Sequence, residues 1–208
     1  MKNNTLLLIA IATVAAGCAT TGAVMSSVEL DRKTQAVLLE SFRTKGIVGQ
    51  DRLQRDATQI ACADYTGKAI PKDTGAQIEK LEMTYVKFPA DRKYMGDWRR
   101  GEAIAQSGRG LQFSDSLSVQ RGGNCYACHQ ISQQELSFGT LGPSLLGFGK
   151  SRGASEAIQQ YTFGKIYNAH AYSACSNMPR FGTMGILSEQ EIKDLVALLV
   201  DPASPVNK

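Results

Sequence analysis

Apolar residues recur at helical spacing in several stretches of the chain, and no region is rich in strand-like patterns. In residues 74–88, Ile78, Leu81, Tyr85 and Phe88 follow one another at intervals of three or four. Similar patterns predict helices over residues 30–42, 51–62, 97–107, 155–167 and 188–201. We therefore expect an all-α protein.

The last predicted helix has the clearest start and end signals. Ser188 stands at the N-cap, and Glu191 follows at the position that completes a capping box. Pro202 ends the helix. The apolar stripe between these signals comprises Ile192, Leu195, Val196 and Leu199. This helix should bury one face in the core.

The predicted helices fall into two groups. Residues 28–90 contain too few apolar positions for a separate core of their own, so we interpret them as a helical N-terminal extension. Residues 96–202 form a second unit, in which glycine-rich loops over 109–124 and 139–153 separate the helices.

The first residues have the pattern of an export signal. Lys2 precedes an apolar run over residues 6–16 that is too short to span a bilayer, so residues 1–18 are predicted to be a signal peptide. The sequence Ala-Ala-Gly-Cys ending at Cys18 resembles a lipobox, which would acylate Cys18. The alternative is a simple cleavage after Ala19 or Ala23. Either way we expect a periplasmic protein, anchored by lipid through Cys18 in the first case.

Charge and cysteine content narrow the function. The net charge is only +4 among 208 residues, and no Lys/Arg run marks a basic stripe, which argues against a nucleic-acid binder.

The sequence contains five cysteines. Cys18 belongs to the leader or anchor, and Cys125 and Cys128 share one motif, which leaves Cys62 and Cys175. In an oxidising compartment we expect these two to form a disulfide.

The sequence Cys125-Tyr126-Ala127-Cys128-His129 is the C-x-x-C-H pattern of covalent haem attachment. Two thiols on one helical turn can form thioethers to the two vinyl groups of a haem, while the adjacent imidazole meets the iron. We predict one haem c, with His129 as the proximal ligand. A zinc site built from the motif cysteines with Cys62 and Cys175 is the alternative, which export disfavours.

The second axial ligand must come from elsewhere in the chain. Met178 ranks first because it lies in a proline-containing loop before the last helix, and Met184 and His170 follow. Methionine with histidine raises the iron potential and suits electron transfer. On the proximal side, a backbone carbonyl near Pro143 could accept a hydrogen bond from the His129 ring and so fix its orientation.

The order of these pieces over residues 96–202 resembles the class I cytochrome c fold. Residues 166–170 and 175–182, with the sequences Ile-Tyr-Asn-Ala-His and Cys-Ser-Asn-Met-Pro-Arg-Phe-Gly, are more specific. They resemble SoxX, the small cytochrome subunit of the SoxAX complex of sulfur-oxidising bacteria. The extension is similar to that of longer SoxX variants, and the family's distal ligand corresponds to Met178.

The resemblance implies an electron-transfer subunit. SoxAX joins thiosulfate oxidatively to a cysteine of the carrier SoxYZ, with the sulfur chemistry in SoxA. SoxX passes the released electrons to a small soluble cytochrome c. On this reading the chain has no catalytic residue of its own and pairs with SoxA. The alternatives are a free-standing electron shuttle and a haem enzyme with an open sixth iron position.

Overall fold

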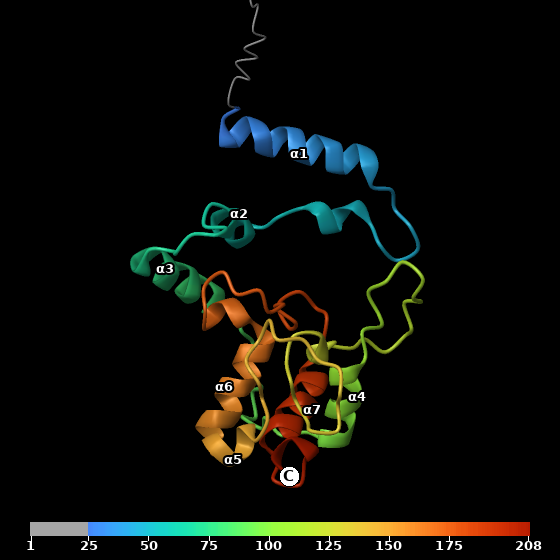
Figure 1. Cartoon of the computed structure of the whole chain (residues 1–208), viewed down its shortest axis with the longest axis vertical. Coiled ribbons are helices and arrows are strands. Elements are labelled where there is room, and N and C mark those ends of the chain that lie inside the picture. The colour runs from blue at the N-terminus through green and yellow to red at the C-terminus, as the bar shows by residue number, and fades with distance from the viewer. Residues whose placement is uncertain (1–24) are drawn as a thin grey trace, which may run out of the picture. The chain divides into compact units, whose positions relative to one another are not determined.

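The computed structural model describes residues 25–208, which form two compact units (Figure 1). The first unit ends at Ser41 and the second runs from Phe42 to Lys208. The predicted signal peptide and Cys18 lie outside the described residues. Within them the chain is helical, with one isolated β-bridge between Lys45 and Val48, and the all-α prediction is confirmed. Among residues 25–208, no helix is long and apolar enough to cross a bilayer.

The first unit contributes one described helix, α1, over Ser27–Ser41. The second unit contains α2 to α7 and four short 3-10 turns, η1 to η4. Their bounds are η1 Gln50–Leu53, α2 Ala57–Ala63, α3 Lys72–Met83, α4 Trp98–Gln106, η2 Cys125–Ala127, α5 Phe148–Arg152, α6 Glu156–Tyr167, η3 Ala169–Ala171, α7 Glu189–Val200 and η4 Pro205–Asn207.

The boundary between the units differs from the grouping that we drew from the sequence. We grouped residues 28–90 as one extension, whereas α1, which has no buried residue, belongs to the first unit. Residues 42–90 instead belong to the same compact unit as the C-terminal helices. We use the term inner extension for residues 42–90 below.

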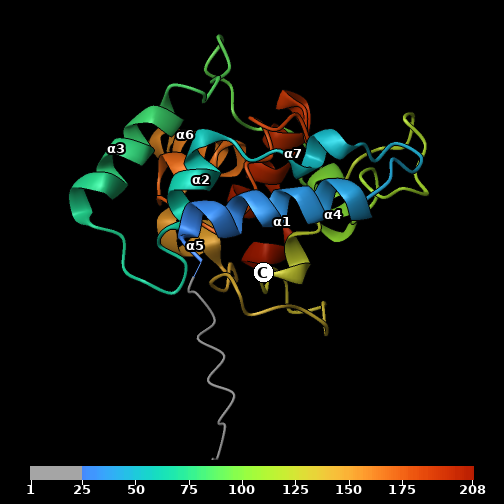
Figure 2. The same ribbon diagram turned by 90° about the horizontal axis from the view of Figure 1, so that it is seen from above.

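Helix α7 is the centre of the second unit, and α4 packs against it (Figures 1 and 2). The capping box forms as predicted: the Ser188 N–H donates to Glu191 Oε2 at 2.8 Å and the Ser188 Oγ accepts from the Glu191 N–H. Gly101 allows the close approach of α4, because a Cβ there would lie 2.2 Å from the Asp194 carbonyl oxygen. The predicted apolar stripe is buried along α7.

A charged pair also joins these two helices. The Asp194 carboxylate on α7 is almost fully buried and accepts hydrogen bonds from Arg100 Nε at 2.8 Å and Arg100 Nη2 at 2.9 Å. It accepts a third bond, of 2.8 Å, from the Asp97 N–H at the start of α4. Burial acts to raise the pKa of Asp194, but these donors outweigh it and lower the pKa, so the group is ionised.

Two helix predictions and one loop prediction need correction. The helix expected over residues 51–62 is divided into η1 and α2, because Asp56 caps α2 in a second capping box with Gln59. Helix α3 ends at Met83, not at 88. Finally, α5 interrupts the loop expected over residues 139–153.

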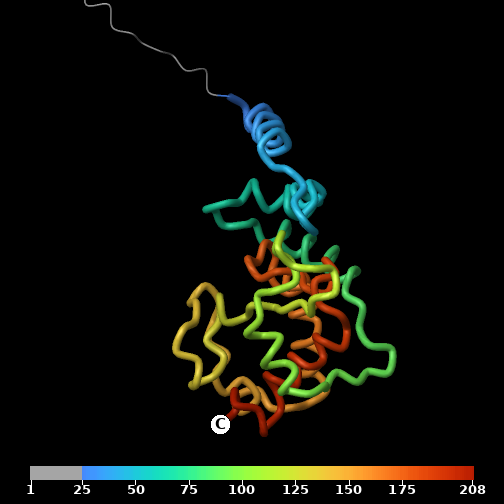
Figure 3. The backbone as a smooth tube through the Cα atoms, turned by 90° about the vertical axis from the view of Figure 1, so that its right-hand side faces the viewer, coloured from blue at the N-terminus to red at the C-terminus, as the bar shows by residue number. Residues whose placement is uncertain are grey.

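The face of α3 also differs from the predicted one. Ile78 is buried as expected, but Leu81 and Tyr85 are exposed, and the other buried side chain is that of Glu82. Helix α3 packs against η3. The buried face of α3 therefore carries the polar side chain of Glu82 where the sequence pattern predicted an apolar stripe. In Figure 3 the inner extension lies against the loop that precedes α7.

Candidate functional site

The C-x-x-C-H motif forms one tight turn. The turn begins after Asn124, which adopts a left-handed conformation with φ 46°. The N–H groups of Cys128 and His129 both donate to the Cys125 carbonyl, at 3.1 and 2.9 Å. The turn therefore brings the two thiols and the imidazole into one neighbourhood, as the attachment of haem requires.

The chemistry of the thiols argues against zinc. Burial raises the pKa of the Cys125 thiol to about 12, whereas zinc binds cysteine as the thiolate. Cys125 and Cys128 are unpaired, but Cys62 and Cys175 are bonded to each other and cannot be ligands. Within the described part of the chain, no group of three or more His, Cys, Asp or Glu residues could hold a metal ion.

The imidazole of His129 is oriented by a hydrogen bond from its Nδ1, the ring nitrogen that would not bind the iron. His129 Nδ1 donates to the Pro143 carbonyl oxygen at 2.8 Å, the contact that we expected from the sequence. The segment is held in place because the Gly142 N–H donates to the Cys128 carbonyl at 2.8 Å. With Nδ1 engaged, Nε2 is the nitrogen left for a metal. Two unpaired cysteines on one turn and an oriented imidazole fit a covalently attached haem.

Gly142 is required by this arrangement. A Cβ at position 142 would lie 2.2 Å from His129 Cε1 and 2.5 Å from Nδ1. Gly142→Ala should therefore displace the ring, break its bond to Pro143 and destabilise the protein by about 1–3 kcal/mol through overpacking. A raised high-spin fraction in the ferric haem spectrum and a lower thermal midpoint would show it. Gly75→Ala is the control, because its Cβ would meet its nearest neighbours at 3.7 Å or more. A wild-type spectrum for Gly142→Ala would contradict the assignment.

The three candidates for the second ligand have different surroundings. Met178 is half-buried and packs against the hydrophobic core. Met184 is 55% exposed. The His170 ring is buried, and its Nε2 lies 2.8 Å from the Ser176 carbonyl oxygen, so that nitrogen is already engaged. These surroundings favour Met178, which remains our prediction.

Comparison with known proteins agrees with this geometry. The family model of cytochrome c matches residues 112–201. This range includes the attachment turn, residues 125–129, and the methionine loop, residues 175–182, which carries Met178. The chain carries a class I cytochrome c domain. Cytochrome c domains bind haem c covalently, and this domain does so too.

One curated relative covers nearly all of this cytochrome c protein. It is an uncharacterized lipoprotein of Aquifex aeolicus (strain VF5), 35% identical over 188 residues, with 88% of this chain and 85% of the relative covered. The two proteins belong to one family. Among solved structures, SoxXA from P. pantotrophus is similar with 26% identity and a TM-score of 0.37, over 51% of this chain and 82% of that one.

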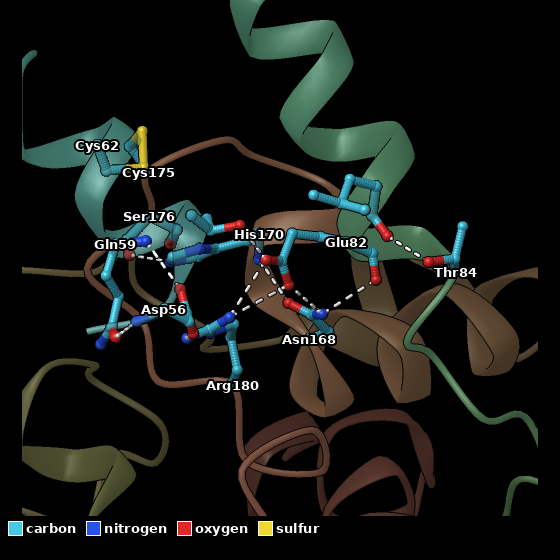
Figure 4. Close-up of polar contacts among 12 residues, drawn as sticks. Asp56, Gln59, Cys62, Glu82, Thr84, Asn168, His170, Cys175, Ser176 and Arg180 are labelled. Carbon is cyan, nitrogen blue, oxygen red and sulfur yellow. Dashed lines mark hydrogen bonds and ion pairs between the residues drawn. A yellow bond between two sulfur atoms is a disulfide. The ribbon is translucent and has the colours of Figure 1, made fainter. Parts of the chain in front are cut away.

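A largely buried polar cluster connects the segment of residues 168–180 with α2 and α3 (Figure 4). Arg180 pairs with Glu82 Oε1 at 3.2 Å and with Asp56, and Asn168 Nδ2 donates to Glu82 Oε2 at 2.7 Å. Neither Glu82 nor Asp56 was predicted from the sequence to belong to the site. The Asp56–Gln59 capping signature was available in the sequence, but no local pattern connects Glu82 with an arginine 98 residues away.

Proposed function

We propose that this protein is the SoxX-type electron-transfer subunit of a SoxAX thiosulfate-oxidising complex. The observation that carries the proposal is that three residues of the SoxX-like segments 166–170 and 175–182 make specific polar contacts around the loop of Met178. Asn168 bonds Glu82, His170 bonds the Ser176 carbonyl and Arg180 pairs with Glu82, all behind the loop of Met178.

Haem c, when bound, supplies a one-electron redox centre. Cys125 and Cys128 would attach it, and His129 would ligate the iron while Pro143 fixes the tautomer of the imidazole. Met178 would be the distal ligand. With Cys62 and Cys175 joined in a disulfide, no described cysteine is left to act on sulfur compounds. The division of labour follows: electrons pass through this chain, and thiosulfate is conjugated elsewhere.

Exposed apolar side chains next to the attachment turn support an obligate partner over a free shuttle. Leu136 is 92% exposed and Leu141 is 71% exposed. Both lie in the loop whose Gly139 N–H donates to the Tyr126 carbonyl at 2.8 Å, so the loop borders the turn directly. Large apolar side chains exposed beside a functional site fit a protein interface. We propose that SoxA docks here and that electrons leave to a small soluble cytochrome c.

The same proposal assigns a place in the cell. The complex would act on the SoxYZ carrier in the periplasm, with this chain tethered through a lipid on Cys18. The name of the Aquifex aeolicus relative, a lipoprotein, supports the tether. Mass spectrometry of the protein purified from membranes would detect the acyl groups.

The assay supplies thiosulfate, SoxYZ and an electron acceptor to this chain with and without SoxA. We expect the chain alone to be reduced and reoxidised but to form no S-thiosulfonate on SoxYZ, and we expect turnover when SoxA is added. Turnover by the isolated chain would place catalysis on this subunit. Full electron transfer without any binding to SoxA would instead favour a free-standing shuttle.

A further inference from the structure

The methionine loop, residues 175–182, is held by the inner extension at several points. Cys175, at its start, is bonded to Cys62 of α2, with the two Cα atoms 5.3 Å apart. Just before it, the Ala174 N–H donates to Glu79 Oε1 of α3 at 3.1 Å. Near its end, Arg180 pairs with Asp56 at the start of α2 and with Glu82 of α3. Met178 lies between these attachments.

The Arg180 attachment is buried and charged. Glu82 is 1% exposed and the side chain of Arg180 is 7% exposed. Thr58 Oγ1 donates to Glu82 Oε1 at 2.5 Å and Asn168 Nδ2 donates to Oε2, so both carboxylate oxygens have partners besides arginine. Burial acts to raise the pKa of Glu82, but these donors and the charge of Arg180 outweigh it and lower the pKa. The carboxylate is therefore ionised.

Arginine is suited to this position because its planar guanidinium reaches two carboxylates at once, which lysine cannot do in the same geometry. Nη1 faces Glu82 and Nη2 faces Asp56. An arginine displaced from this cluster would leave the buried carboxylate of Glu82 without its counter-charge, so the loop has one strongly preferred position. Pro179, with its fixed φ, separates Arg180 from Met178 and transmits that position along a short stiff segment.

The other end of the loop needs its own restraint. Cys175 has φ 58°, in the left-handed region that residues other than glycine rarely adopt. Such a conformation persists where the surrounding structure enforces it. The bond to Cys62 provides that enforcement from α2.

We infer that the inner extension is part of the haem site: Arg180, held by Asp56 and Glu82, is a positioning residue that keeps Met178 at the distal side of the haem, together with the Cys62–Cys175 bond. The inference rests on the proposed ligation by Met178. It assigns to residues 42–90 a role in the redox centre that neither their sequence nor their distance along the chain indicates.

The test uses the haem-loaded full chain with two variants. Arg180→Lys keeps the positive charge but removes the planar guanidinium that reaches both carboxylates. Asp56→Asn removes one partner charge, and asparagine preserves the N-cap of α2. Because the side chain of Asp56 is 42% exposed, this second variant should fold even if the first does not. The matched control is Arg100→Lys, which alters the Arg100–Asp194 pair between α4 and α7.

Three readouts separate positioning from general stability. They are the far-red charge-transfer band of Met-ligated ferric haem, the rate of cyanide binding, and hydrogen exchange of residues 174–182. For Arg180→Lys we expect a weakened band, cyanide binding about tenfold faster or more, and faster exchange, because charged hydrogen bonds close the loop. Asp56→Asn should give smaller changes in the same direction. Arg100→Lys should lower the unfolding midpoint only.

Two results would overturn the inference. One is a wild-type band and wild-type cyanide rate in both variants. The other is an equal change in Arg100→Lys, which would mean that any loss of stability releases the ligand. A failure of the underlying ligation looks different: the far-red band would then be absent from the wild-type protein, or would persist in Met178→Ala.

Discussion

Met178→Ala should abolish the far-red charge-transfer band of the ferric protein and lower the reduction potential of the haem. Methionine opposite histidine raises the potential of cytochromes c, so its loss acts in the opposite direction. The vacated iron position should also bind cyanide readily. Visible absorption, a redox titration and cyanide binding measure the three effects on one preparation. Because Met178 packs against the core, a loss of about 2–5 kcal/mol in unfolding free energy should accompany them.

The chain offers a matched control for this experiment. Met184 lies six positions further on and is largely exposed. It was the second candidate for the distal ligand in the sequence. Met184→Ala should keep the band, the potential and the cyanide rate of the wild type. The opposite pattern, with the band lost in Met184→Ala and kept in Met178→Ala, would exchange the two assignments. A band kept in both variants would point away from methionine altogether, and His170 would then be the ligand to test.

The Cys62→Ser, Cys175→Ser double variant should lose about 4–5 kcal/mol of unfolding free energy. The bond closes a loop with a sequence separation of 113 residues, and loop-closure models give this value as an upper guide. Both cysteines are replaced together so that no free thiol remains beside the methionine loop. Denaturant unfolding of the oxidised haem protein measures the loss.

The control and the direct check are simple. Ala63→Ser, at the exposed end of α2, should have little effect on stability. Alkylation of the unreduced, unfolded wild-type protein should leave the peptides of Cys62 and Cys175 unmodified. Modification of both peptides would exclude the disulfide in solution.

The parts of the structure that the sequence predicted are those governed by neighbouring residues. The capping box of Ser188 and Glu191, the turn of Cys125 to His129 and the bond from His129 to the Pro143 carbonyl each involve few residues or a recognisable motif. The cysteine pair followed from counting. In each case the chemistry of the residue types restricted the outcome.

The parts that the sequence did not predict depend on distant residues. The spacing in α3 predicted an apolar face, yet Glu82 is buried because Arg180, Thr58 and Asn168 meet it from three other segments. A buried glutamate is costly without such partners, so no local pattern would assign one. The assignment of α1 and of residues 42–90 to different compact units is of the same kind, since it depends on contacts between residues far apart in the sequence.

The burial of Cys125 has a consequence for the maturation of the protein. Cys62 must be joined to Cys175 while Cys125 and Cys128, which lie between them in the sequence, stay reduced until haem is attached. Burial raises the pKa of Cys125 to about 12, so little thiolate is present at neutral pH, and thiol exchange proceeds through the thiolate. A chain that folds before it meets haem is therefore protected at Cys125 from mispairing.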